Sequence, residues 1–131
     1  MRAFTLGLLF LMATLTVAGQ DEEFTGWMKS AGRAAGTLGK LEKKTGKDAV
    51  QSAEQLGAVY ENMIGFWRQR NAADAVKWSE EGKAAAVILA SAANSGDEAK
   101  AAEAFKSVGA TCKPCHAAHR EKNAEGQYRI K

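Results

Sequence analysis

Two cysteines and two histidines lie close together near the C-terminus, in the stretch T-C-K-P-C-H-A-A-H-R at residues 111–120. Cys112 and Cys115 are the only cysteines of the 131-residue chain, and His116 and His119 are its only histidines. Thiols and imidazoles at this spacing are suited to four kinds of chemistry. They bind a metal ion, exchange disulfides, form a structural disulfide, or attach a haem group covalently.

The spacing favours haem attachment. Cys112, Cys115 and His116 form C-x-x-C-H, the sequence to which c-type haem is bound. On a helix, residues three apart share a face, so both thiols can add to the vinyl groups along one side of a porphyrin while the adjacent imidazole binds the iron. We therefore predict one haem c, held by thioether bonds to Cys112 and Cys115, with His116 as an axial iron ligand.

The competing kinds of site find less support elsewhere in the sequence. A structural zinc site generally needs four ligands, and no second C-x-x-C or histidine pair exists outside this stretch. A redox-active dithiol is expected near a βαβ pattern, which the sequence lacks. A disulfide between Cys112 and Cys115 remains as the alternative for an exported chain, and it would make the protein a haem-free helical interaction module. It would leave His116 unexplained.

The N-terminal segment, residues 1–19, has the layout of a secretory signal peptide. Arg2 precedes an apolar run that is too short to span a bilayer comfortably, and small residues follow this run up to Gly19. We expect cleavage after Ala18 or Gly19 and a periplasmic mature protein, with an uncleaved anchor as the alternative. No second apolar segment follows, so no stable membrane insertion is expected after cleavage.

Residues 20–131 have the pattern of one small helical domain. Removing Arg2 lowers the formal net charge from +3 to +2, which is too small to indicate nucleic-acid binding. The alternation of β-branched residues that is typical of strands is absent, and apolar residues recur at spacings of three and four. Helices are expected at about residues 22–44, 48–70, 74–93 and from 97 onward, with Asp48 and Asp97 as N-caps. This predicts an all-α fold, an antiparallel up-and-down four-helix bundle with haem near the C-terminal end of the fourth helix.

Two finer expectations concern the later helices. Pro114 should bend or restart the fourth helix near Gly109, because proline removes a backbone donor and crowds the carbonyl of Ala110. The residues expected to face the core from the third and fourth helices are Trp78, Gly82, Ala85, Ile88, Leu89, Ala92, Ala99, Ala102, Phe105 and Val108.

Two segments resemble the cytochrome c′ family, the class II c-type cytochromes. C-K-P-C-H-A-A-H-R is similar to the haem-attachment region of this family, with Arg120 at the position of a basic residue that members commonly carry after the haem histidine. W-M-K-S-A-G-R-A-A-G-T-L, residues 27–38, is similar to the M-K-x-x-G-R segment of the low-spin members. In those proteins a first-helix methionine binds the iron, so the resemblance implies Met28 as the second axial ligand. Members commonly dimerise through their first two helices, which makes a homodimer through these helices one option.

The resemblance to the low-spin members implies an electron carrier and not an enzyme. With His116 and Met28 both bound to the iron, no position is left for a substrate, and one-electron transfer between redox partner proteins is the expected function. Most cytochromes c′ leave the second axial position without a protein ligand. A five-coordinate protein that binds NO or CO, with Met28 only packed beside the haem, is therefore the alternative.

The remaining candidate residues have simpler expected roles. Met63, the other methionine of residues 20–131, is expected to fill the core. His119 is expected at the surface or at the haem edge. Lys113, Lys122 and Arg120 could form a weak basic rim for docking an acidic redox partner.

Overall fold

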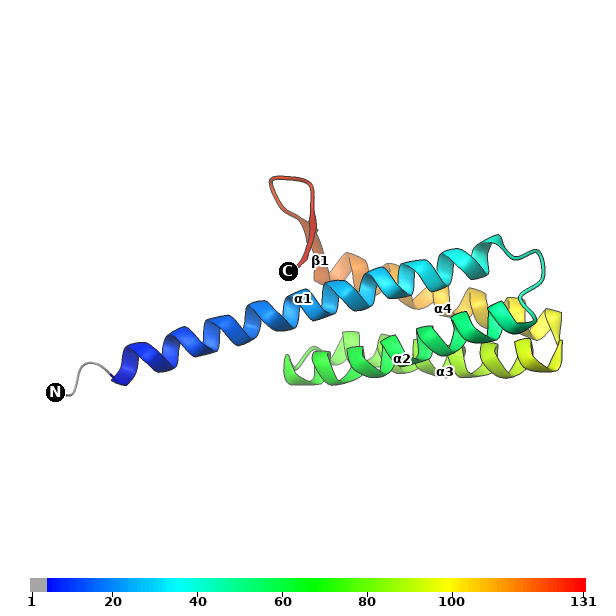
Figure 1. The fold of residues 1–131 in the computed structure, drawn as a ribbon, viewed down its shortest axis with the longest axis horizontal. Helices are drawn as coiled ribbons and strands as arrows, with labels where there is room; N and C mark the ends of the chain where they lie inside the picture. Colours follow the sequence, from blue (N-terminus) through cyan, green and yellow to red (C-terminus); the bar gives the residue numbers. More distant parts are fainter. Residues whose placement is uncertain (1–4) are drawn as a thin grey trace.

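The computed structural model describes the backbone of residues 5–131 and the side chains of residues 19–131. Its elements are α1 (Thr5–Lys40), α2 (Lys47–Gln69), α3 (Ala73–Ser95), α4 (Glu98–His119), β1 (Arg120–Lys122) and β2 (Tyr128–Ile130). Consecutive helices run in opposite directions, with α1 packed on α2, α2 on α3 and α3 on α4 (Figure 1). The described residues thus confirm the predicted antiparallel up-and-down four-helix bundle.

The helix bounds agree with the predicted ones for α2, α3 and α4 to within about two residues. The first helix differs, because α1 begins at Thr5 and ends at Lys40. The predicted signal peptide and its cleavage point lie almost entirely outside the residues whose side chains are described. Among the described residues, no helix combines the length and the apolar character needed to cross a membrane.

The two predicted N-caps have different outcomes. The carboxylate of Asp97 accepts a hydrogen bond from the Lys100 backbone N–H at 3.1 Å, which confirms it as the N-cap of α4. Asp48 is not a cap, because α2 begins one residue before it at Lys47. The N-cap of α2 is Gly46, whose φ of 90° lies in the region that glycine adopts without strain.

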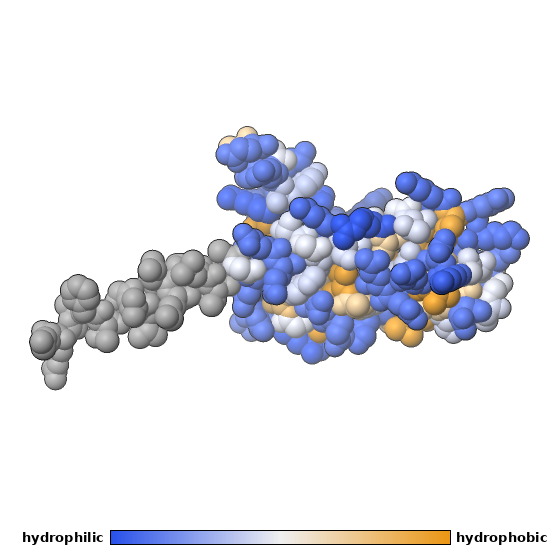
Figure 2. Space-filling view, in the orientation of Figure 1, coloured by the Kyte–Doolittle hydropathy of each residue, from blue (hydrophilic) through white to orange (hydrophobic). Residues whose placement is uncertain are grey.

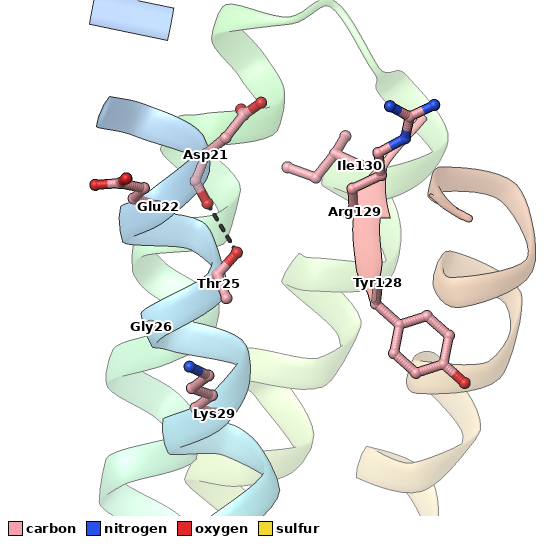
Figure 3. Close-up of a pocket in the computed structure, with 8 residues that line it drawn as sticks. All are labelled: Asp21, Glu22, Thr25, Gly26, Lys29, Tyr128, Arg129 and Ile130. Carbon is pink, nitrogen blue, oxygen red and sulfur yellow. Dashed lines mark hydrogen bonds between the residues drawn. The ribbon is translucent and has the colours of Figure 1, made fainter. Parts of the chain in front are cut away.

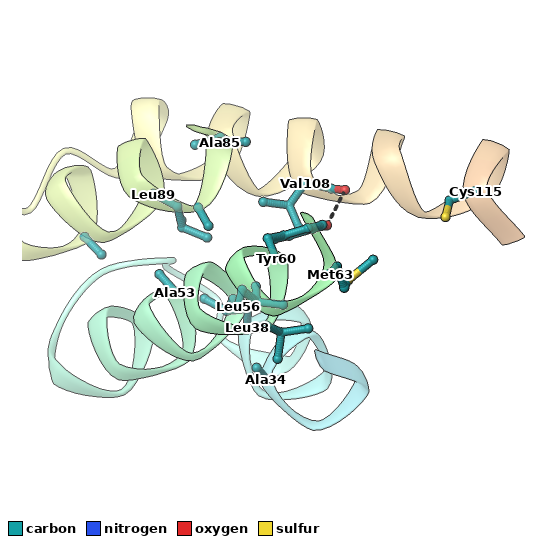
Figure 4. Packing of buried hydrophobic residues seen from close by; sticks show 14 of the residues in the cluster. Ala34, Leu38, Ala53, Leu56, Tyr60, Met63, Ala85, Leu89, Val108 and Cys115 are labelled. Atoms are coloured by element: carbon teal, nitrogen blue, oxygen red, sulfur yellow. Dashed lines mark hydrogen bonds between the residues drawn. The ribbon is translucent and has the colours of Figure 1, made fainter. Parts of the chain in front are cut away.

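The core combines aliphatic and aromatic side chains with many alanines between them. Leu38 of α1, Leu56 of α2, Leu89 of α3 and Val108 of α4 are at most 2% exposed (Figure 4). Removing such a side chain from water stabilises the fold by about 1.5–3 kcal/mol. The small alanine side chains let the helices approach closely, and the alanines that are at most 2% exposed are Ala34, Ala49, Ala53, Ala75, Ala86, Ala92, Ala93 and Ala101.

Three of the expected core positions are wrong. Ile88 is 45% exposed, and Ala99 and Ala102 are exposed as well. Ala101 and Ala104 face the core instead. Apolar and small residues occupy both faces of these helices, so the sequence pattern does not determine which face of α4 points to the core. An error of one residue in this choice rotates the helix by about 100°. On the face shown in Figure 2, exposed apolar residues lie among hydrophilic ones.

The fourth helix runs without a break through Pro114, so the restart expected near Gly109 is wrong. Proline at position 114 deprives the carbonyl of Ala110 of its helical donor. Ala110 is exposed, which allows water to take the place of that donor. The C-x-x-C-H residues therefore stand on one continuous helix.

A C-terminal β-hairpin, residues 120–131, follows α4 and was not expected from the sequence. Its strands pair antiparallel with Arg120 opposite Ile130, and Gly126 has a φ of 78° in the turn. The Lys131 N–H donates to the carbonyl of His119 at 3.1 Å, and Ile130 packs against the core. The hairpin thus stands beside α1 at the end of α4 (Figure 1).

Candidate functional site

The last two turns of α4 carry both thiols, and the two differ in exposure. Cys112 is exposed, whereas Cys115 is 8% exposed, and both are free. Burial raises the pKa of the Cys115 thiol to about 11, with smaller contributions from the charges of Asp74 and Cys112. At neutral pH Cys115 is therefore an uncharged thiol.

His116 follows on the next position of the helix and is half-buried. Burial lowers the pKa of its imidazole, and the nearby charge of Arg120 acts in the same direction. The ring is therefore favoured in its neutral form, in which one nitrogen has a free electron pair for a metal. Two free thiols followed directly by a neutral imidazole fit the donors that haem c requires.

His116 lies on the flank of α4 that faces away from α3. The groove between α3 and α4 is lined on the α4 side by Lys100, Glu103, Ala104 and Ser107. His116 is eleven residues after Phe105, which is close to three full turns of helix, so these two residues lie on the same face of α4. This face differs from the one that lines the groove. The Nζ atom of Lys44, in the connection between α1 and α2, lies 5.6 Å from the centre of the Phe105 ring. This flank of α4 is thus the side toward α1.

Met28 lies on the flank of α1 that faces away from α2. Ser30 marks the α2 side, because Gln55 of α2 donates a hydrogen bond to its Oγ atom at 2.6 Å. Met28 is two residues earlier, which is about 200° around the helix. Thr25, one turn before Met28, borders the groove beside β2, and β2 belongs to the hairpin that continues α4. Met28 itself is half-buried and packs against the core.

Helical phase therefore puts Met28 and His116 on the flanks of α1 and α4 that border each other, on opposite sides of the boundary between the two helices. We call this boundary the α1–α4 seam. Within the described residues, these two helices share little close backbone contact, in contrast to the three packed pairs. The other predicted methionine, Met63, is 6% exposed in the core of α2. The two methionines thus occupy different environments, and Met28 alone is at the seam.

Arg120 stands at the start of β1, where its guanidinium lies 3.9 Å from the centre of the Tyr128 ring. Lys122 approaches the same ring at 5.1 Å, and Lys113 is exposed on α4. The hairpin and α1 enclose a groove of about 420 Å³, lined by Asp21, Glu22, Thr25, Gly26, Lys29, Tyr128, Arg129 and Ile130 (Figure 3). The predicted basic residues are therefore present at this end of the bundle, with two of them held against an aromatic ring.

His119 is more enclosed than a surface histidine. Its side chain is 19% exposed, and its Nε2 atom lies 3.0 Å from each carboxylate oxygen of Asp74. Its ring stacks on Trp67 at a centroid distance of 4.7 Å and meets the edge of Trp78 at 6.3 Å. His119 therefore ties the end of α4 to α2 and to the start of α3. Asp74 was not a sequence candidate, because it is 45 residues away.

Tyr60 is the second residue of the site that the sequence predicted only as part of the core. Its hydroxyl oxygen lies 2.8 Å from the Oγ1 atom of Thr111 and 3.8 Å from the sulfur of Cys112. Burial, followed by the nearby Cys112, raises the pKa of Tyr60 well above its ordinary value of 10.0. Its phenol is therefore neutral and directed at the first thiol. Among the residues that the structure describes, no three side chains of histidine, cysteine, aspartate or glutamate gather as a metal-binding group.

The chain resembles known proteins in part of its sequence and in its fold. Residues 65–120 match the family model described as cytochrome c′, and this segment includes α3, α4 and the C-x-x-C-H residues. A solved cytochrome c′, described as having an unusual ligand-controlled dimer dissociation, is 22% identical, with a TM-score of 0.64 and coverage of 86% of this chain and 95% of that one. At this identity the likeness shows the shared fold. None of the curated proteins matches the chain. The bundle, the family match over residues 65–120 and the thiol pair beside His116 together support placing the chain in the cytochrome c′ family, whose members are monohaem c-type cytochromes.

Proposed function

We propose that this cytochrome is exported to the periplasm and carries single electrons between redox partner proteins, with His116 and Met28 as the axial ligands of its iron. The observation that carries the proposal is the placement of these two residues on opposite sides of the α1–α4 seam. The iron of a bound haem c supplies one-electron exchange between its ferric and ferrous states. The chain determines how the haem is attached, which side chains bind its iron and which groups surround it.

Two thioether bonds to Cys112 and Cys115 would hold the haem against α4. The thiols are three residues apart on one unbroken helix, so they present two sulfur atoms at a fixed separation. Covalent attachment retains the cofactor without a deep enclosed pocket, which suits a small bundle. Arg120, directly after α4, places a permanent positive charge close to the site.

Met28 is the residue that separates an electron carrier from a gas-binding protein. A methionine sulfur on the second axial position favours ferrous iron and blocks small ligands. The half-buried position of Met28 on the seam supports this role, and the burial of Met63 in the core leaves Met28 as the methionine available at the site. Because both axial positions would be filled by side chains, we propose that the protein is not an enzyme.

The surroundings of the site are suited to brief contacts with protein partners. The exposed Lys113 and the basic residues of the hairpin offer positive charge next to the attachment turn, which would attract an acidic redox partner. A homodimer through α1 and α2 is compatible with this arrangement, because the attachment residues stand on α4.

Carbon monoxide binding to the reduced protein tests the proposal. The parent protein should not react readily, because Met28 occupies the position that carbon monoxide needs. Met28→Ala should bind it and should convert the ferric iron to high spin, whereas Met63→Ala should behave as the parent does. A parent protein that is high-spin and reacts with carbon monoxide would contradict electron transfer as the function and would favour gas binding.

A further inference from the structure

Tyr60 reaches from α2 to the turn of α4 that begins the haem-attachment sequence. Its side chain is 6% exposed, and its hydroxyl donates to the backbone carbonyl of Val108 (Figure 4). The same hydroxyl lies within hydrogen-bond distance of the side chains of Thr111 and Cys112. The strongest of these contacts is the one to Thr111 at 2.8 Å. A buried phenol whose oxygen lies near a haem-attaching sulfur is well placed to affect the cofactor.

The position of the Tyr60 ring is fixed from the opposite side by Gly82 of α3. A Cβ atom at position 82 would lie 2.3 Å from the Cε1 and Cζ atoms of Tyr60, far inside van der Waals contact. The absence of a side chain at Gly82 is therefore what allows the ring to occupy this space. Three helices thus determine where the hydroxyl lies, with α2 supplying the ring, α3 the space and α4 the hydrogen-bond partners.

The number of available protons limits how these groups are bonded. The Thr111 hydroxyl donates to the Val108 carbonyl at 2.8 Å, and the free Cys112 thiol donates to the same carbonyl at 3.6 Å. The Tyr60 hydroxyl then has one proton, and three acceptors lie within its reach: the oxygen of Thr111 at 2.8 Å, the carbonyl of Val108 at 3.5 Å and the sulfur of Cys112 at 3.8 Å. In attachment the thiol adds across a vinyl double bond, so that a sulfur–carbon bond forms and the proton moves to the other vinyl carbon. The resulting thioether sulfur is an acceptor only.

We propose that Tyr60 is a positioning residue for the attached haem, which it serves by donating a hydrogen bond toward the sulfur of Cys112. This inference rests on the proposed function, because it requires a thioether at Cys112. A donor directed at this sulfur places partial positive charge beside the cofactor and therefore stabilises the reduced form. The phenol raises the reduction potential and fixes the first attachment point against α2.

The reduction potential of the purified exported protein tests the inference. Tyr60→Phe keeps the ring and removes only the donor, so its potential should fall while its haem remains covalently bound. Thr111→Val removes the nearest competing acceptor and leaves the sulfur and the Val108 carbonyl within reach of the Tyr60 proton, so the potential should stay the same or rise. Tyr128→Phe is the matched control, because Tyr128 is the only other tyrosine and is 54% exposed.

The outcomes separate this inference from the proposed function. A haem-bearing parent in which Tyr60→Phe and Tyr128→Phe have equal potentials overturns the role of Tyr60 and leaves electron transfer standing. A parent isolated without haem overturns both. If Tyr60→Phe does not accumulate as a folded protein, the reduction potential of Thr111→Val tests the inference instead. A fall in its potential would contradict the inference, and an unchanged or raised potential would support it.

Discussion

Gly82→Ala is the substitution whose effect on stability follows most directly from the structure. The added Cβ atom would lie 2.3 Å from two ring atoms of Tyr60 and 2.8 Å from a third. Either the ring or α3 must therefore move. The ring is held by core contacts and by the hydrogen bond to Thr111, so moving it also weakens that bond.

Three effects determine the size of the change in stability. Replacing glycine with alanine inside a helix gains about 1 kcal/mol in helix propensity. Forcing an extra methyl group into a packed interior costs about 1–3 kcal/mol. Loss of the hydrogen bond between Tyr60 and Thr111 costs a further 0.5–1.5 kcal/mol or so. Overpacking outweighs the propensity gain, and we expect a net destabilisation of about 0.5–3.5 kcal/mol.

Thermal unfolding followed by circular dichroism measures this effect, with Gly65→Ala as the matched control. Gly65 is exposed on α2, and a Cβ atom there would meet nothing within 4 Å. The control should therefore show only the propensity gain of about 1 kcal/mol, a rise in Tm of roughly 4–8 °C. Equal or greater stability of Gly82→Ala compared with Gly65→Ala would refute the packing of Tyr60 against α3.

Three further predictions address the core, the attachment and the acid stability. Met63→Ala should destabilise the protein by about 2–5 kcal/mol in chemical denaturation, because Met63 is buried, while leaving the haem spectrum nearly unchanged. Replacing Cys112 and Cys115 with alanine should yield protein whose haem is extracted by acidified solvent, whereas the parent should keep its haem, and extraction from both would contradict covalent attachment. Although desolvation opposes the shift, hydrogen bonds from Ala75 and His119 lower the pKa of Asp74 below its ordinary value of 3.8. Its stabilising contribution is thus present above pH 3.8 and is lost as the pH falls through the lower folded-state pKa, so Tm should drop less on acidification in Asp74→Asn than in the parent.

Local sequence signals predicted most of the helices and the attachment turn. Gly46, Gly96 and Asp97 interrupt or cap helices through their own backbone and side chains, so the limits of α2, α3 and α4 follow from nearby residues. Cys112 and Cys115 are only three positions apart, which makes their proximity a property of one helix.

Features that depend on tertiary contacts could not be predicted in the same way. The contact between Tyr60 and Thr111 spans 51 positions, and that between Asp74 and His119 spans 45. Predicting them requires the rotation of each helix about its axis. In α4 the alanines on both faces give no contrast in size that would determine this rotation, which is why Ala102 was expected in the core.

The C-terminal hairpin has a local sequence signal, which lies in its turn residues. The strands themselves lack the alternation of β-branched residues by which strands are usually predicted. Asn123 accepts hydrogen bonds from the backbone N–H groups of Glu125 and Gln127, and Gly126 adopts a positive φ. Asparagine favours turns because its side chain bonds the backbone just after it, and glycine favours them because it adopts a positive φ without strain. The strands themselves are only three residues long, which is too short for an alternating pattern to be visible.

The near-infrared absorption spectrum of the ferric protein tests ligation by His116 and Met28 most directly. Methionine sulfur bound to ferric haem iron gives a weak sulfur-to-iron charge-transfer band in this region. If Met28 binds the iron, the parent shows this band, Met28→Ala lacks it and Met63→Ala retains it. A parent without the band and with a high-spin spectrum, or a band that disappears in Met63→Ala, would contradict the assignment of Met28.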